Sequence, residues 1–378
     1  MTRYAPGFQP RRRTGRRYVV MVILVFALFG GWSWFWHYAS VTAQATIDGW
    51  RAREAKVGRV YSCGSQTIGG YPFRIEVNCD RASAVLNRNK PPLEIKTPGV
   101  LIAAQIYQPT LLISEFTGPL TIAEPGYPPE FIANWTLAQT SVRGTPAAPQ
   151  RVSIVFDRPV LDRMNGAVRE NLLRANHIEI HGRMAEGSAV NKPVIEVALS
   201  LDDASAPALS PVSVQPVDAD IVAVLRGLND FSPKPWPVRF REIQAAGGRI
   251  DITKARVQQG ETIALGSGAL SINANGRLQG QLNVTVAGLE PFLKTIGADR
   301  LVQASPTVDR LAGSLDKLIP GLGSVARQQA GANVAAGINL LGQPATLEGQ
   351  RAVTLPLRFD NGAIFLGPIP IGQSPALF

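Results

Sequence analysis

The chain has 378 residues, of which 45% are hydrophobic and 17% charged, and its formal net charge is +10. Six of its 38 basic residues fall in the first 17 positions, which leaves 32 against 28 acidic residues and a net charge of +4 for the rest. A mildly basic surface without a run of Lys and Arg argues against a nucleic-acid-binding protein.

The first 38 residues are typical of a membrane anchor. Residues 1–17 form a basic tail with six arginines and no acidic residue, and residues 18–38 carry no charged side chain. A helix of 21 residues is about 31 Å long, enough to cross the hydrocarbon core of a bilayer. The positive-inside rule places the tail in the cytoplasm, so we expect a single-pass protein of the cell inner membrane with the bulk of its chain in the periplasm. Aromatic side chains, which favour the membrane interface, crowd the far end of the span: Trp32, Trp34, Trp36 and Tyr38.

A cleaved signal peptide is the alternative interpretation of this segment. Ala43-Gln44-Ala45 resembles a small-residue cleavage site. The apolar run is, however, longer than the roughly 7 to 15 residues usual for a signal peptide. We therefore expect an uncleaved anchor.

The transmembrane helix is expected to continue into the periplasm as a juxtamembrane helix, residues 39–58. Ala43, Ile47 and Trp50 recur at helical spacing, and Gly58 suits a C-cap. The charged residues fall largely elsewhere around this helix. We expect its apolar stripe to dock on the first sheet.

The only two cysteines enclose a predicted hairpin, with arms at residues 61–68 and 73–80. Glycine in the turn supplies a positive φ and proline a fixed bend. The symmetry of these arms puts Cys63 opposite Cys79, near the separation that a disulfide requires. The turn motif comprises Gly69, Gly70, Tyr71, Pro72 and Phe73.

We predict that these cysteines form a structural disulfide, because an exported compartment permits one. A closed loop of this size stabilises the fold by about 3 kcal/mol in the chain-entropy model. The alternative is a redox pair or a metal site. It is disfavoured because the sequence has no Cys-x-x-Cys and no histidine near either cysteine.

Two further hairpins are predicted from Asn-Gly turns between alternating runs. In residues 270–286 the turn is Asn275-Gly276, and apolar residues alternate with Ser, Asn, Gln and Thr. A similar pattern surrounds Asn361-Gly362, where Pro356 makes the first arm an edge or irregular strand. Strands with one apolar and one polar face suit an antiparallel sheet with one wet face.

The exported part is predicted to be mainly β, with two antiparallel β-rich lobes and a few short helices. Roughly 340 residues exceed the size at which one core usually stops growing. The first lobe covers residues 59–204 and the second residues 217–378, joined by a Pro-rich linker at 205–216. Further strands are expected at 150–156, 176–184, 193–201 and 249–257. Helices are expected at 217–229, 289–297 and 306–318.

Motifs for catalysis or metal binding are weak. The best metal candidate is His177-Ile-Glu-Ile-His181, but along a strand its two histidines would lie about 13 Å apart, which favours a polar solvent-facing strand. The sequence has no Gly-x-Ser-x-Gly, P-loop or Gly-x-Gly-x-x-Gly motif. We expect no enzyme activity, no cofactor and no bound metal.

A set of short motifs occurs along the chain: Ile47-Asp48-Gly49-Trp50, Gly58-Arg59, Cys63, Gly70-Tyr71-Pro72-Phe73-Arg74, Cys79, Gly367-Pro368-Ile369-Pro370-Ile371-Gly372 and Pro375-Ala376-Leu377. Together they resemble a proteobacterial family named domain of unknown function 2125. The resemblance covers most of the exported chain and implies no known activity and no active-site residues. Residues 275–282 are also similar to AsmA-like envelope proteins, whose anchored β-sheets with an apolar concave face are thought to handle phospholipids.

We therefore expect an inner-membrane-anchored periplasmic protein with an amphipathic β-sheet groove that binds or handles lipid acyl chains. Few predicted helices could cover the apolar faces of its strands. Its partners would be the membrane, through residues 18–38, and phospholipid, with no nucleic acid. The alternative is a non-catalytic structural or scaffolding envelope protein whose apolar faces pack together as a closed β core.

Overall fold

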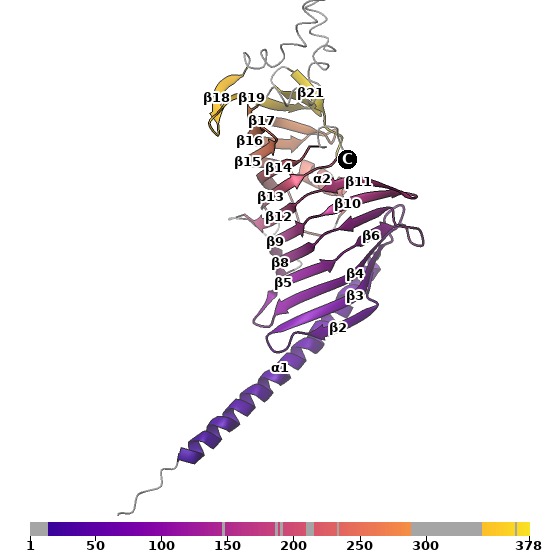
Figure 1. Ribbon diagram of the computed structural model, residues 1–378, viewed down its shortest axis with the longest axis vertical. Coiled ribbons are helices and arrows are strands. Elements are labelled where there is room, and N and C mark those ends of the chain that lie inside the picture. Colours follow the sequence, from indigo (N-terminus) through magenta and orange to yellow (C-terminus); the bar gives the residue numbers. More distant parts are fainter. Residues whose placement is uncertain are drawn as a thin grey trace, which may run out of the picture.

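The computed structural model of the chain is mainly β, with one large antiparallel sheet standing on a long N-terminal helix (Figure 1). The part of the chain that the structure describes contains one further helix, which is short. The described residues are 14–145, 148–185, 188–189, 192–208, 215–232, 234–288, 342–366 and 369–378.

Helix α1, Thr14–Lys56, runs without a break through the predicted span and the predicted juxtamembrane segment. It ends just before Gly58, whose positive φ of 83° suits the residue that follows a helix. Within the described residues, α1 is the one helix long and apolar enough to cross a membrane. Its N-terminal half projects from the sheet, while its C-terminal half packs on β1, β2 and β3, the first strands (Figure 1).

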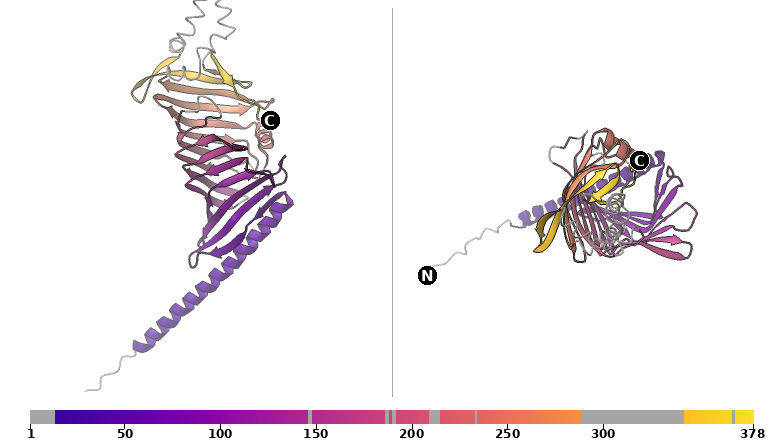
Figure 2. Two further views of the ribbon diagram at one scale, coloured as in Figure 1. Left: turned by 45° about the vertical axis from the view of Figure 1, so that its right-hand side comes forward. Right: turned by 90° about the horizontal axis from the view of Figure 1, so that it is seen from above.

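The main ladder of the sheet is antiparallel throughout, and most of its strands pair with neighbours in the sequence (Figure 2). It begins with β1 (Arg59–Ser62) and β2 (Ser65–Gly69), which both pair with β3 (Arg74–Leu86). The following strands, in pairing order, are β4 (Leu93–Gln105), β5 (Gln108–Thr117), β8 (Leu137–Thr145), β9 (Ala148–Asp157), β12 (His177–Met184), β13 (Ile195–Ala204), β14 (Val217–Arg226), β15 (Arg249–Gln259), β16 (Thr262–Ile272), β17 (Leu278–Ala287) and β19 (Gln350–Asp360). The far edge of β19 pairs with β18 (Gln343–Leu347) and β20 (Ala363–Leu366), and β20 pairs with β21 (Ile369–Gln373).

The sheet forks at β4. One end of this strand, residues 99–105, pairs with β5 and continues the main ladder. The other end, residues 94–96, pairs with β6 (Leu120–Ala123) and starts a branch. The branch continues through β7 (Phe131–Asn134), β10 (Val160–Asn165) and β11 (Val168–Arg174). Two groups of strands therefore diverge from one strand.

Both hairpins predicted from Asn-Gly turns are confirmed. In the first, Ile272 of β16 pairs with Leu278 of β17, and in the second, Asn361-Gly362 joins β19 to β20. Of the two alternatives expected from Pro356, an edge or an irregular strand, the edge is wrong, since β19 has partners along both of its edges. Pro356 lies where pairing with β18 has ended and pairing with β20 has not begun, so its missing N–H interrupts no ladder on that side.

The helix predicted over residues 217–229 is wrong, because this segment contains strand β14. A short apolar run of this kind is compatible with a helix or a strand. It forms a strand here because β13 and β15 pair with it along both edges. Helix α2, Trp236–Ala245, was not predicted. The helices expected at 289–297 and 306–318 lie outside the described residues.

The strands on either side of the expected linker at 205–216 are β13 and β14, and they pair with each other. The sheet therefore continues from the first predicted lobe into the second.

Candidate functional site

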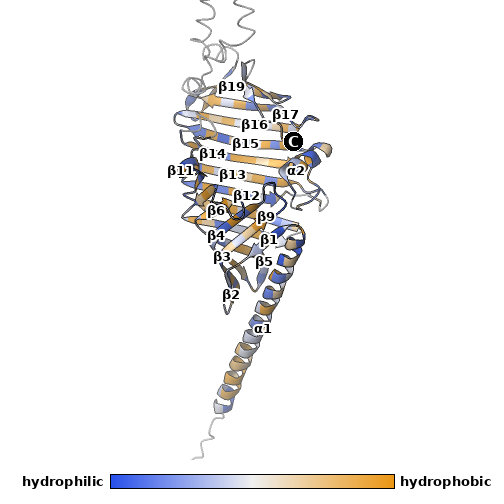
Figure 3. Ribbon diagram, turned by 90° about the vertical axis from the view of Figure 1, so that its right-hand side faces the viewer, coloured by the Kyte–Doolittle hydropathy of each residue, from blue (hydrophilic) through white to orange (hydrophobic). Residues whose placement is uncertain are grey.

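One face of the main ladder is apolar, because alternate residues of its strands are hydrophobic and the register brings them into line. On β12, Ile178 lies opposite Phe156 of β9, and Ile180 lies opposite Ile154. Bands of hydrophobic residues recur from strand to strand along the ladder (Figure 3). Further members of this apolar face, from α1 outward, are Val77, Ile102, Ala138, Leu199, Ile221, Ile250, Leu282 and Leu355.

A cavity of about 550 Å³ opens on the apolar face where the sheet forks. Its volume lies within the roughly 300 to 1,000 Å³ of small-molecule sites. None of the residues that line it carries an ionisable side chain. The main ladder contributes Phe116, Ala138, Ile154, Phe156, Ile178 and Ile180. The branch contributes Leu120, Ala133, Val160, Leu161 and Leu173.

Trp135, between the branch and β8, adds an indole ring to this cavity. Its Nε1 donates a hydrogen bond to the main-chain carbonyl of Phe116 at 2.7 Å, and its ring centroid lies 5.7 Å from that of Phe156. Because the polar N–H is already bonded to the backbone, the rest of the indole serves as apolar surface.

A second cavity, of about 300 Å³, lies farther along the same face, between α2 and the sheet. Ile250 and Leu270 of the apolar face line it, together with Ile243 of α2. Arg239 of α2 also lines it and is only 9% exposed. The Arg239 guanidinium donates to the Asp230 carboxylate and to Glu242 of its own helix, at 3.2 and 3.1 Å. Arg239 and Glu242 are largely buried and Asp230 is partly exposed, and together they tie α2 to the loop before it.

The His177-x-Glu-x-His181 pattern lies on the opposite, polar face of β12, as the alternation predicted. Glu179 lies between the two histidines and contacts Nε2 of His177 at 2.9 Å and Nε2 of His181 at 3.0 Å. Nδ1 of His177 also contacts the Asp157 carboxylate at 2.5 Å. These hydrogen bonds, first that to Glu179 and then that to Asp157, raise the pKa of His177, and the hydrogen bonds from both histidines lower the pKa of Glu179. No group of three or more His, Cys, Asp or Glu side chains is placed to hold a metal ion among the described residues.

Cys63 and Cys79 form the predicted disulfide, with their Cα atoms 5.4 Å apart. The predicted register is wrong, because Gln66, and not Cys63, lies directly opposite Cys79. The turn occupies residues 70–73, later than assumed, and Cys63 falls in the break between β1 and β2. The bond therefore joins this break to the middle of β3.

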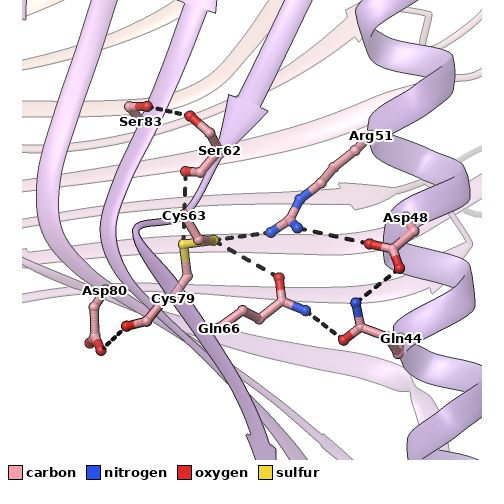
Figure 4. Close-up of a disulfide and its surroundings, with 10 residues drawn as sticks. Gln44, Asp48, Arg51, Ser62, Cys63, Gln66, Cys79, Asp80 and Ser83 are labelled. Carbon is pink, nitrogen blue, oxygen red and sulfur yellow. Dashed lines mark hydrogen bonds and ion pairs between the residues drawn. A yellow bond between two sulfur atoms is a disulfide. The ribbon is translucent and has the colours of Figure 1, made fainter.

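A polar network connects the disulfide to α1 (Figure 4). Arg51 of the helix directs Nη2 at Cys63 Sγ, at 3.0 Å. Gln66 donates to Gln44 at 2.7 Å, and Gln44 donates to Asp48 at 2.9 Å. The spacing of the cysteines predicted the disulfide. The sequence could not predict the contacts from Arg51 and Gln44, because these depend on how α1 packs on the hairpin.

The turn motif lies where β2 meets β3, and Gly69 is the last residue of β2. Gly70 has a φ of 95°, and a Cβ atom there would lie 2.7 Å from the main-chain oxygen of Arg74, so glycine is required. Tyr71 and Phe73 pack on the C-terminal part of the apolar segment of α1. The ring centroids of Tyr71 and Trp36 are 5.5 Å apart, and those of Phe73 and Trp32 are 6.3 Å apart.

Residues 36–375 match a family described as an uncharacterized protein conserved in bacteria, DUF2125. The chain belongs to this family. The match begins inside α1 and extends beyond β21, so it includes the disulfide, the larger cavity and, apart from Leu377, the lining of the second cavity. No curated protein matches the chain. The family resemblance noted in the sequence is thus confirmed, and the weaker likeness to AsmA-like proteins stays a prediction.

Sequence reasoning missed the residues that line the two cavities. Alternation indicated that these side chains share an apolar face, but the larger cavity exists because the branch stands against the ladder. No short-range signal marks the fork at β4 or the side chains that it brings together.

Proposed function

We propose that this DUF2125 protein is a non-catalytic, single-pass inner-membrane protein whose periplasmic sheet holds the acyl chains of a lipid. The observation that carries the proposal is the apolar cavity of about 550 Å³ at the fork of the sheet. A closed scaffold core would fill such a space with its own side chains.

The exposure of the apolar face supports an apolar ligand. Leu112 and Ile180, on strands β5 and β12, are 40% and 36% exposed, and most of their apolar neighbours are only half-buried. Contiguous apolar surface of this kind marks a binding site, because covering it gains about 25 cal/mol for each Å² removed from water. A lipid chain is long and narrow, which suits a strip that continues from strand to strand.

The chemistry of the cavity supports binding without catalysis. General acid–base and most nucleophilic catalysis use ionisable side chains, and none lines the larger cavity. The ionic cluster around Glu179 is separated from the cavity by the sheet itself, since it lies on the other face.

The location supports a lipid of the cell envelope. The long apolar helix and the disulfide both fit an envelope protein. The six arginines before the apolar segment favour a cytoplasmic N-terminus, and an uncleaved α1 would then hold the sheet at the outer surface of the inner membrane.

Photochemical labelling tests the proposal. Full-length protein is reconstituted in vesicles that contain a phospholipid with a diazirine at the end of one acyl chain, then illuminated, digested and mapped by mass spectrometry. We expect adducts on the apolar-face residues of β8, β9 and β12, in addition to annular labelling of α1. Adducts confined to α1 would overturn the groove and favour the scaffold alternative.

A pair of neighbouring substitutions on β9 provides the matched control. Ile154 lines the cavity, whereas Val155 lies on the polar face, opposite Glu179. Burying an unpartnered amide costs about 1 to 3 kcal/mol, so Ile154→Asn should reduce labelling of the cavity by about tenfold. Val155→Asn should leave it unchanged. Equal loss of labelling in both variants, with unchanged circular dichroism, would contradict the proposal.

A further inference from the structure

The tip of the β2–β3 hairpin packs on the part of α1 that is expected to lie within the membrane. The Tyr71 hydroxyl lies 2.9 Å from Ser33 Oγ. The Tyr71 ring packs edge-to-face with the rings of Phe29 and Trp36, with ring centroids 6.4 Å and 5.5 Å apart. Phe29 precedes the end of the expected span, at Tyr38, by nine residues, which is about 13 Å along a helix. The tip therefore lies at the level of the outer half of the span.

Several main-chain carbonyls of this tip accept hydrogen bonds, as a bilayer requires of polar groups within it. Trp32 Nε1 donates to the carbonyl of Pro72 at 2.9 Å, and Trp36 Nε1 donates to the carbonyl of Arg74 at 3.0 Å. The Arg74 N–H donates across the turn to Gly70. Unpaired carbonyl groups are costly in hydrocarbon, and here indoles of the anchor helix supply donors to two of them. In water these carbonyls would need no such partners.

A second hairpin tip lies beside the first and is also aromatic. Gln105, at the end of β4, pairs with Arg74, and the N–H of Ile106 donates to the carbonyl of Phe73 at 3.1 Å. Tyr107 in this tip is 70% exposed, and Phe73 is 63% exposed. Large aromatic rings that project from adjacent turns, next to an apolar helix, suit the interfacial region of a membrane.

We propose that the tips of the β2–β3 and β4–β5 hairpins insert into the periplasmic leaflet of the inner membrane beside α1. The inference rests on the anchored topology of the proposed function and adds to it the place where lipid meets the sheet. The apolar face reaches these tips at Ala104 and Leu112, which pair with each other. Insertion would thus bring one end of the apolar face to the level of the lipid chains.

Site-specific photocrosslinking of the full-length protein tests the insertion. The photoreactive amino acid p-benzoylphenylalanine replaces Phe73 or Tyr107, in vesicles of phosphatidylethanolamine and phosphatidylglycerol. Tyr127 is the matched control, since it is 69% exposed and lies in the loop between β6 and β7. That loop follows Ala123, which pairs with Glu94, about 36 Å along the strand from Gln105. We expect phospholipid adducts at positions 73 and 107 and none at 127.

Three outcomes would overturn the insertion: no lipid adducts at positions 73 and 107, equal adducts at all three positions, or crosslinks from 73 and 107 to protein only. The result is separable from that for the groove. Lipid adducts at the tips without labelling of β8, β9 and β12 would support insertion and refute the groove, and the reverse pattern would do the opposite. The intact mass of the mature protein shows whether α1 is cleaved as a signal peptide. Loss of residues 1–43 would remove the anchor on which insertion depends.

Discussion

Single residues of β12 show how one strand serves two environments. Ile178 and Ile180 line the cavity, while His177, Glu179 and His181 form hydrogen bonds on the opposite face. The alternation of strand side chains separates the two sets, so the ionic cluster contributes to stability without contact with the apolar cavity. Its members are partly exposed, which limits that contribution.

The ionic cluster on β12 should make stability depend on pH. His177 has a raised pKa in the folded protein, so its contribution is complete below the unfolded pKa of about 6.5 and is lost as pH rises through the folded value. Glu179 has a lowered pKa, so its contribution is lost only as pH falls below about 4.5 and through the folded value. The thermal midpoint of wild type should exceed that of His177→Gln most at pH 5.5, and the difference should shrink by pH 8.5. A difference that stays constant with pH would contradict this assignment.

Helix α2 covers part of the apolar face of the sheet. It begins with Pro235 as its N-cap and has Pro237 in its first turn, where proline is tolerated. Its Ile243 is buried over the second cavity, and Arg239 joins it to the preceding loop. This helix thus partly covers one stretch of the face, whereas the larger cavity is walled by strands of the branch.

Arg239→Met should loosen α2. The methionine keeps most of the apolar bulk but removes the donors to Asp230 and Glu242. The bond to Glu242 is largely buried, and a hydrogen bond of this kind to a charged group contributes about 1.5 to 3 kcal/mol. We expect a loss of stability of about 2 kcal/mol and faster amide hydrogen exchange across Trp236–Ala245. Arg241→Met, at an exposed position of the same helix, is the control: it removes only a cation–π contact with the Phe378 ring at 5.2 Å, so both measurements should change less. Equal effects of the two substitutions would show that the buried network does not hold the helix.

As a whole, the molecule is a ladder of strands with a long apolar helix at one end. The helix α1 leaves the sheet at one end, and successive strands stack away from it (Figures 1 and 2). The disulfide, the polar network around Gln44 and the aromatic contacts of the hairpin tip all lie at this end. In the proposed topology, the part of the sheet best tied to the helix would therefore be the part nearest the membrane.

Topology is testable on the intact chain. Alkaline phosphatase requires export for activity, so fusion after Phe378 should be active, whereas fusion before Met1 should not. The charge asymmetry around residues 18–38 is the reason for this expectation. The unfused protein should retain its N-terminus and stay in the membrane on carbonate extraction. Release by carbonate, or an active N-terminal fusion, would contradict a cytoplasmic N-terminus on an uncleaved anchor.

Features that depend on neighbouring residues could be predicted from the sequence. The uncharged run at 18–38, the cysteine pair and the Asn-Gly turns at 275–276 and 361–362 all act through local chemistry: hydrophobic length, a covalent bond between nearby strands, and backbone φ. Alternation likewise predicted that strands would have one apolar face. Alternation and the Asn-Gly turns predicted the β-rich fold, and the two cysteines are among the motifs that carry the family resemblance.

Other features were decided only by the tertiary structure. Residues 217–226 became a strand because β13 and β15 offer backbone hydrogen bonds along both edges, which a short apolar run cannot reveal. Cys79 faces Gln66 because the turn sets the register, and the larger cavity exists because β4 pairs with two different strands. In each case the outcome depends on partners distant along the chain, and the free energy of pairing and burial, rather than local preference, selects among conformations that the sequence allows.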